Sequence, residues 1–88
     1  MITVVATGGF DPIHSGHIKY LKEASLCGTR LVVGVNSDEW LSRKKGRSFM
    51  PFSERAAIVS ELGCVDQVIG FDDSDGSAID CLEQVKRT

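Results

Sequence analysis

The chain has 88 residues, of which 42% are hydrophobic and 25% are charged, and its formal net charge is −2. These values predict one domain spanning residues 1–88 and give no reason to expect a nucleic-acid partner. Three cysteines without a C-x-x-C pair indicate neither a disulfide framework nor a zinc knuckle, so we expect a cytoplasmic protein. We recognise no signal peptide and no run of about 20 apolar residues, so we expect no membrane partner.

Three short apolar segments are expected to form strands. Residues 2–6 and 31–35 are rich in β-branched side chains, which is typical of strands buried on both faces of a parallel sheet. Residues 65–69 are a weaker third candidate. The first two strands are separated by residues 15–27, which carry the spacing of an amphipathic helix, and Gly28 is placed to cap its end. This β-α-β unit predicts a right-handed crossover.

Three further helices are expected after the second strand. The first is short and runs through Trp40 and Leu41, followed by a loop over residues 42–50; the others cover residues 51–63 and 78–86. The alternation of strands and helices predicts an α/β fold, namely a Rossmann-like parallel sheet with flanking helices and three strands. The side chains expected to face the core from the last two helices are Ile58, Val59 and Leu62, and Ile79, Leu82 and Val85.

The stretch TGGFDPIHSGH, residues 7–17, joins the first strand to the first helix. Glycines before a helix N-terminus suit a phosphate, because unpaired amide N–H groups and the positive end of the helix dipole face the anion. The spacing excludes both the Walker A loop and G-x-G-x-x-G. His14 and His17 lie three residues apart, so we expect both imidazoles at the carboxyl edge of the sheet, where they can donate hydrogen bonds to phosphate oxygens.

Two other roles remain open for this histidine pair. The imidazoles can cap the helix start, or they can hold a metal. A zinc site needs at least one further protein ligand, and no other cysteine or histidine lies nearby in the sequence.

Basic residues follow the second strand. Residues 43–47, RKKGR, place four positive charges in five residues around a glycine that lets the loop fold over a ligand, although a solvated loop is an equal alternative. Arg55 shares a helical face with apolar residues, so it needs an anion or must extend its charged end to solvent. Trp40 either packs in the core or stacks on a ligand.

The opening motif GGFDPIHSGH resembles the G-x-F-D-x-x-H-x-G-H signature of the cytidylyltransferase-like nucleotidyltransferase superfamily. The resemblance continues through VNSD (residues 35–38), the basic loop, Arg55 and CVD (residues 64–66), and so covers nearly the whole chain. The chain is similar to glycerol-3-phosphate cytidylyltransferases and to adenylyltransferase domains that act on heptose phosphates. VNSD, RKKG and the turn Phe71-Asp72-Asp73 favour the second group.

The resemblance implies transfer of a nucleotidyl group from CTP or ATP to a sugar or polyol phosphate, with release of pyrophosphate and Mg²⁺ bound to the triphosphate. It implies no covalent enzyme intermediate and no metal held by the protein, and it leaves the choice between CTP and ATP open. It assigns a phosphate contact to a lysine of the basic loop, without deciding between Lys44 and Lys45, and we expect Asp11 to brace the turn. The implied catalytic residues are His14, His17, Lys44 and Arg55, and the implied nucleotide-binding residues are Thr7, Gly8, Gly9, Phe10, Asp11, Gly16 and Lys45.

Family members continue into a fourth and a fifth strand and a Ser/Thr-rich segment that binds the triphosphate. In the family fold the first strand is central, so without the fourth strand one side of its ladder is unpaired. We therefore expect a fragment of a longer product, rather than a truncated member or a chain that completes its sheet with another copy in a homodimer. The rival function is a non-catalytic nucleotide-binding or assembly module that keeps the phosphate site.

Overall fold

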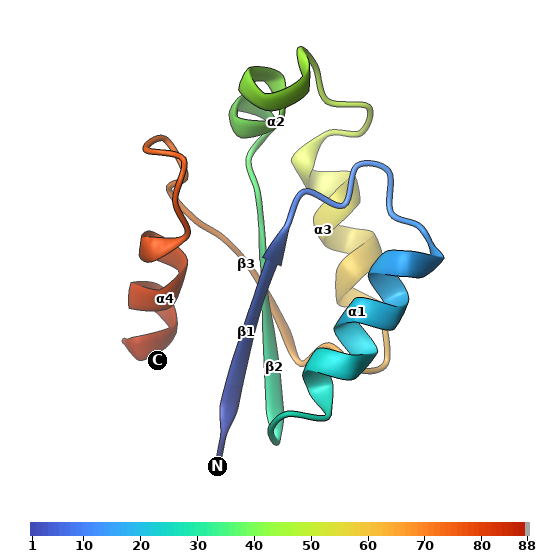
Figure 1. Ribbon diagram of the computed structural model, residues 1–88, viewed down its shortest axis with the longest axis vertical. Helices are drawn as coiled ribbons and strands as arrows, with labels where there is room; N and C mark the ends of the chain where they lie inside the picture. The colour runs from blue at the N-terminus through green and yellow to red at the C-terminus, as the bar shows by residue number, and fades with distance from the viewer. Residues whose placement is uncertain (88) are drawn as a thin grey trace.

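The computed structural model describes residues 1–87 and confirms the α/β, Rossmann-like fold. Strands and helices alternate, and helices lie on both sides of the sheet (Figure 1). Their bounds, in chain order, are β1 (Thr3–Gly8), α1 (Ser15–Ser25), β2 (Arg30–Val35), α2 (Asp38–Lys45), α3 (Phe52–Ser60), β3 (Gln67–Gly70) and α4 (Ile79–Lys86).

The sheet is parallel and has the order β1-β2-β3 within the described residues. The central strand β2 is buried over its last five residues. The expectation that the first strand is buried on both faces is wrong, because most residues of β1, which lies at the edge of the sheet, are only partly buried. Of its six residues only Ala6 is fully buried, and Ile2, which was expected to begin the strand, precedes it and is 62% exposed.

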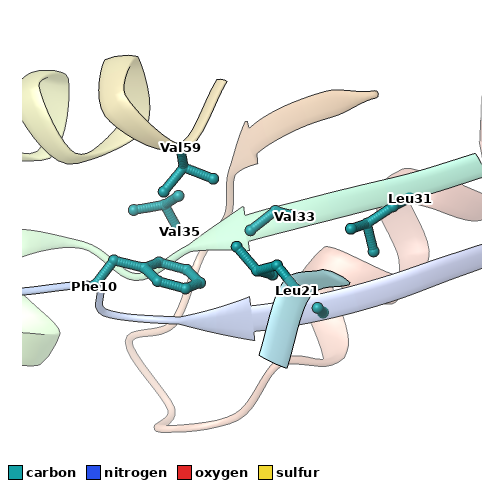
Figure 2. Close-up of a cluster of buried hydrophobic side chains, with 7 residues drawn as sticks. Phe10, Leu21, Leu31, Val33, Val35 and Val59 are labelled. Atoms are coloured by element: carbon teal, nitrogen blue, oxygen red, sulfur yellow. The ribbon is translucent and has the colours of Figure 1, made fainter. Parts of the chain in front are cut away.

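The main core lies between the sheet and helices α1 and α3. Figure 2 shows Leu21 of α1 beside Val33, and Val59 of α3 over Val35, with Phe10 at the end of the cluster. The side chains that β2 contributes to this core, Leu31, Val33 and Val35, come from alternate positions of the strand, as its two-residue period requires. Helix α4 covers the opposite face, where the Sγ of Cys81 packs so close to Gly34 that a Cβ there would lie 2.5 Å from it.

The inward face expected for α4 is wrong for Ile79 and Leu82, whereas Val85 is half-buried and lines a small cavity beside Val32 and Ile69 of the sheet. Cys81 is fully buried, whereas Ile79 is 59% exposed and Leu82 is 48% exposed. The helix approaches the sheet through Cys81 and through Gln84, whose side-chain amide donates to the carbonyl of Gly70 at 3.0 Å. This contact turns the stripe of Ile79 and Leu82 away from the strands.

The ends of α1 and α3 also differ from those predicted from the sequence. Helix α1 stops at Ser25, and Gly28 is not its cap; instead, a Cβ at Gly28 would lie 2.6 Å from the carbonyl oxygen of Ile2, so the glycine permits close packing. Helix α3 is shorter than expected, with Pro51 as its N-cap, and it buries Val59 while Ile58 is 36% exposed.

Helix α2 is longer than expected, and this changes the setting of the basic residues. Arg43, Lys44 and Lys45 form its last turn, where positive charge complements the helix dipole. Gly46 adopts a left-handed conformation, with φ of 90°, and ends the helix. Three of the four basic residues expected in a loop therefore lie at the end of a helix, and Arg47 follows it. Over the part of the chain that the structure describes, no helix has the length and apolar character needed to span a bilayer.

Candidate functional site

An open pocket of about 510 Å³ lies at the carboxyl ends of β1 and β2, a size typical of small-molecule sites. Figure 1 shows α2 above this end of the sheet, near the turn that leads from β1 into α1. Three elements supply the pocket: that turn, the start of α1, and one face of α2. The lining residues are Gly9, Phe10, Asp11, Pro12, His14, His17, Trp40, Leu41, Lys44 and Lys45.

The side chains of both histidines accept backbone N–H groups at the start of α1. His14 is the N-cap, and its Nδ1 accepts the backbone N–H of Gly16 at 3.0 Å. The Nδ1 of His17 accepts the backbone N–H of His14 at 3.1 Å, which completes a capping box. The ring centroids are 4.0 Å apart.

This capping fixes the tautomer of both rings. Because each Nδ1 accepts a hydrogen bond, each neutral imidazole carries its proton on Nε2. The Nε2–H groups lie on the ring edges opposite the capped backbone, and neither is engaged by another group within residues 1–87. The capping role and a role as phosphate donor therefore use different nitrogen atoms, and one pair of side chains can perform both.

The surroundings of His17 favour its neutral form. Its ring packs edge-on against Phe10, with centroids 5.2 Å apart. Burial, and then the charge of neighbouring His14, lower the pKa of His17 from its ordinary value. At neutral pH His17 is thus an uncharged Nε2–H donor.

Glycines in the motif make room for neighbouring side chains. A Cβ at Gly16 would lie 2.8 Å from Cε1 of His14, so the H-x-G-H spacing lets the ring fold over the helix start. A Cβ at Gly9 would lie 2.8 Å from Cδ2 of Leu41, so α2 packs directly on the glycine turn. Phe10 follows with a left-handed φ of 53° and is buried, which anchors the turn in the core.

Asp11 holds the chain after α2 against this turn. Its carboxylate accepts the backbone N–H groups of Phe49 at 2.6 Å and Met50 at 2.7 Å, and it pairs with the Nζ of Lys45 at 2.9 Å. Burial acts to raise the pKa of Asp11, but these hydrogen bonds outweigh it and keep the pKa below its ordinary value. The carboxylate is therefore ionised and fully engaged.

The two lysines of the pocket differ in their partners. Lys45 is held by Asp11, both at the carboxylate and at the backbone carbonyl, 2.6 Å from its Nζ. The Nζ of Lys44 lies 4.7 Å from the centre of the Trp40 ring and forms no ion pair within the described residues. Lys44 is thus the lysine whose charge is available to a ligand.

Arg55 stands behind the pocket and does not line it. It is fully buried; its Nη1 donates to the carbonyls of Gly9 at 2.9 Å and Asn36 at 2.7 Å, and its Nε donates to Met50 at 3.0 Å. Its Nη2 pairs with the carboxylate of Asp38. The anion that Arg55 needs is therefore supplied by the protein, and Arg55 joins the segments that carry the pocket. The catalytic role that the resemblance implies for Arg55 stays a prediction.

The sequence prediction and the pocket overlap in most residues. The predicted residues that do not line the pocket are Thr7, Gly8, Gly16 and Arg55. Pro12 and Leu41 line the pocket although they were not predicted. Trp40, for which both core packing and ligand stacking are open, is half-buried and lines the pocket. Residues 40, 41, 44 and 45 have the spacing of one helical face, which would have predicted that they line the pocket together if α2 had been expected to reach Lys45. The predicted residues that line the pocket are Gly9, Phe10, Asp11, His14, His17, Lys44 and Lys45.

The metal alternative for the histidine pair lacks further ligands. Among residues 1–87 no group of three His, Cys, Asp or Glu side chains is placed to hold a metal ion. Both Nδ1 atoms are already committed to backbone N–H groups.

Comparison with known proteins places these features in a family. Residues 5–86 match the family model described as Cytidylyltransferase-like. The chain is 42% identical over 80 residues to the bifunctional protein HldE of Hydrogenovibrio crunogenus, covering 89% of this chain and 17% of that protein. It is 47% identical over 74 residues to the HldE of Syntrophotalea carbinolica, covering 81% of this chain and 15% of that protein.

A solved structure agrees with this assignment. The lipopolysaccharide core biosynthesis protein from Thermoplasma volcanium GSS1 matches with a TM-score of 0.88 and 38% sequence identity, covering 98% of this chain and 69% of that chain. The chain thus spans less than a fifth of the two curated relatives and about two thirds of the solved one.

Proposed function

Because this chain belongs to the cytidylyltransferase-like family, we propose that it performs nucleotidyl transfer from CTP or ATP to a sugar or polyol phosphate, releasing pyrophosphate. The observation that carries the proposal is the histidine pair. Reciprocal capping leaves an Nε2–H on each of two adjacent rings that line one open pocket.

The proposed reaction develops negative charge where these donors are needed. A phosphate oxygen of the acceptor attacks the α-phosphorus of the triphosphate. The bond from this phosphorus to the α,β-bridging oxygen breaks, and its electron pair leaves with pyrophosphate. Charge spreads over the non-bridging oxygens of the transferring group and over the leaving group. Imidazole donors that the helix start already orients stabilise this charge without reorganising during the reaction.

Lys44 adds a full positive charge to the same pocket. Its Nζ lies over the Trp40 ring, which holds the ammonium group beside the pocket. We assign the lysine contact with the phosphates to Lys44, and we assign Lys45 to bracing Asp11. Trp40 offers its aromatic surface to the nucleotide or the acceptor.

Mg²⁺ is proposed to arrive with the triphosphate. Mg²⁺ prefers oxygen ligands and is commonly bound through substrate phosphates. Asp11, the carboxylate that lines the pocket, is already engaged by Phe49, Met50 and Lys45, so the donor set suits a metal carried by the nucleotide. When bound, the ion would neutralise charge on the pyrophosphate leaving group.

The cellular location and the oligomeric state belong to the same proposal. Cys27, Cys64 and Cys81 are free thiols, which accords with the cytoplasmic location proposed from the sequence. Completion of the sheet by a second copy at the open edge of β1 stays an alternative to the expected fragment.

The test is pyrophosphate release. The protein is incubated with Mg²⁺, one of ATP, CTP, GTP or UTP, and a panel of sugar and polyol phosphates. Release that requires both a triphosphate and an acceptor, and that is lost in His17→Ala, supports the proposal. Calorimetric binding of a nucleotide without release in any combination supports the non-catalytic module instead. Neither binding nor release contradicts both functions.

A further inference from the structure

Asp73 is a buried carboxylate that does not line the pocket. It lies in the turn between β3 and α4 and is 4% exposed. Its Oδ2 accepts from the side-chain amide of Asn36 at 3.0 Å and from the backbone N–H of Ser37 at 2.8 Å, and its Oδ1 accepts from the hydroxyl of Ser37 at 2.7 Å. Burial acts to raise the pKa of Asp73, but these hydrogen bonds outweigh it and lower the pKa, so the group stays ionised.

These partners begin helix α2. Ser37 is the N-cap of α2, and its hydroxyl, while donating to Asp73, accepts the backbone N–H of Trp40 at 3.0 Å. Farther along the helix, the Nη2 of Arg43 donates to the backbone carbonyl of Asp73 at 2.9 Å. One residue outside the helix thus holds its first turn and its last turn.

Helix α2 has little apolar packing to fix its position. Leu41 is its one fully buried side chain. Its other pocket-lining residues, Trp40, Lys44 and Lys45, are half-buried or exposed. The placement of this face therefore depends on polar contacts at the ends of the helix, and Asp73 supplies several of them.

We propose that Asp73 is a positioning residue for nucleotide binding, which acts by holding α2 so that Trp40 and Lys44 face the pocket. The inference rests on the proposed function, because it concerns the same site. Its physical basis is that a binding side chain is effective only when residues behind it fix its position.

Three variants separate positioning from loss of charge. Asp73→Ala removes all three side-chain hydrogen bonds. Asp73→Asn keeps an oxygen for Asn36 and the Ser37 N–H, and its amide nitrogen can donate to the Ser37 hydroxyl. Asp75→Ala is the matched control, because Asp75 lies in the same turn and its carboxylate accepts hydrogen bonds from Ser77, which is not part of α2.

The first measurement uses no nucleotide. Trp40 is the single tryptophan of the sequence, so acrylamide quenching of its fluorescence reports on α2 directly. We expect quenching to increase about twofold in Asp73→Ala, as expected when a half-buried ring is released from its packing. It should stay at the wild-type value in Asp75→Ala and return toward it in Asp73→Asn. If circular dichroism shows that Asp73→Ala is unfolded, Ser37→Ala removes the hydroxyl contact from the helix side and should increase quenching in the same direction.

The second measurement is the affinity for ATP and CTP with Mg²⁺. We expect Asp73→Ala to raise Kd about tenfold, the order expected when binding groups are misplaced. In a Lys44→Ala background the same change should raise Kd less than about twofold, because coupled residues give non-additive effects.

The outcomes distinguish this inference from the proposed function. A wild-type protein that binds no nucleotide contradicts the function, while the quenching experiment still tests whether Asp73 places α2. Unchanged quenching in Asp73→Ala and Ser37→Ala overturns the positioning role. Equal losses of affinity in the wild-type and Lys44→Ala backgrounds overturn the claim that Asp73 acts by placing Lys44.

Discussion

The Nδ1 of His17 accepts the backbone N–H of His14 at 3.1 Å while the two rings lie 4.0 Å apart. A capping contact of this kind is ordinarily made by a Glu or Gln side chain. An imidazole in the same place leaves a second nitrogen on its far edge. The helix start is therefore stabilised and supplied with a donor by the same side chain.

Replacing His17 should separate these two contributions. We expect His17→Ala to lower the rate of nucleotidyl transfer about 100-fold or more, as for loss of an oriented donor, and to lower the free energy of unfolding by about 1 kcal/mol through the lost cap. His17→Gln keeps a side chain that can reach the His14 N–H and should recover the stability but not the rate. Urea unfolding and pyrophosphate release measure the two effects. Recovery of both by glutamine would reject the role of the imidazole.

The two lysines should differ in binding and stability. Lys44→Ala should weaken triphosphate binding about tenfold or more, because a charged hydrogen bond is lost, and leave stability unchanged to within about 0.5 kcal/mol. Lys45→Ala leaves the Asp11 carboxylate without its cation and should lower stability by about 1 kcal/mol or more. Calorimetry and urea unfolding of both variants provide the comparison. A reversed pattern, with Lys45→Ala causing the larger loss of affinity, would reassign the phosphate contact.

Stability should depend on pH through His17. Because the pKa of His17 is lowered in the folded protein, the unfolded chain binds the proton more tightly. The stability that neutral His17 contributes is therefore fully present above the unfolded pKa of about 6.5 and is lost as the pH falls toward the folded value. Urea midpoints at pH 7.5 and 5.5 should fall less in His17→Gln, which does not titrate. An equal fall in both proteins would contradict this origin.

We expect replacement of Arg55 to reduce the stability of the fold. Arg55→Met keeps much of the side-chain volume but leaves Asp38 and the carbonyls of Gly9 and Asn36 without their donor. We expect a loss of about 3 kcal/mol, as when one partner of a buried pair is removed. Asp38→Asn should cost less, because the Asp38 side chain is 41% exposed. A stable Arg55→Met protein with impaired nucleotide binding would instead indicate direct contact with the ligand.

The contiguous motif made much of the site predictable. The residues between β1 and α1 lie within one turn, so their order in the sequence fixes which of them gather at the sheet edge. His14 and His17 meet because a helix brings residues three apart onto one face. The sequence could not decide between helix capping and phosphate binding for these histidines, because the same three-residue spacing suits both roles.

The parts that sequence did not predict depend on contacts between distant segments. The partner of Arg55 is a carboxylate seventeen positions earlier, brought close by the packing of α3 beside β2. The buried face of α4 depends on Cys81 fitting against Gly34, and the apolar spacing of Ile79 and Leu82 gave the opposite prediction. The open edge of β1 among the described residues agrees with the expectation from the family fold, whereas the partial burial of its faces does not follow from its hydrophobic sequence.

The most direct test of the central claim is nitrogen-15 NMR of the imidazole rings at pH 7.5, recorded without and with ATP or CTP and Mg²⁺. The structure predicts that His14 and His17 are both Nε2–H tautomers before nucleotide is added, and that both Nε2 resonances shift when it binds. An Nδ1–H tautomer at either ring, or nucleotide binding that leaves both Nε2 resonances in place, would contradict the account.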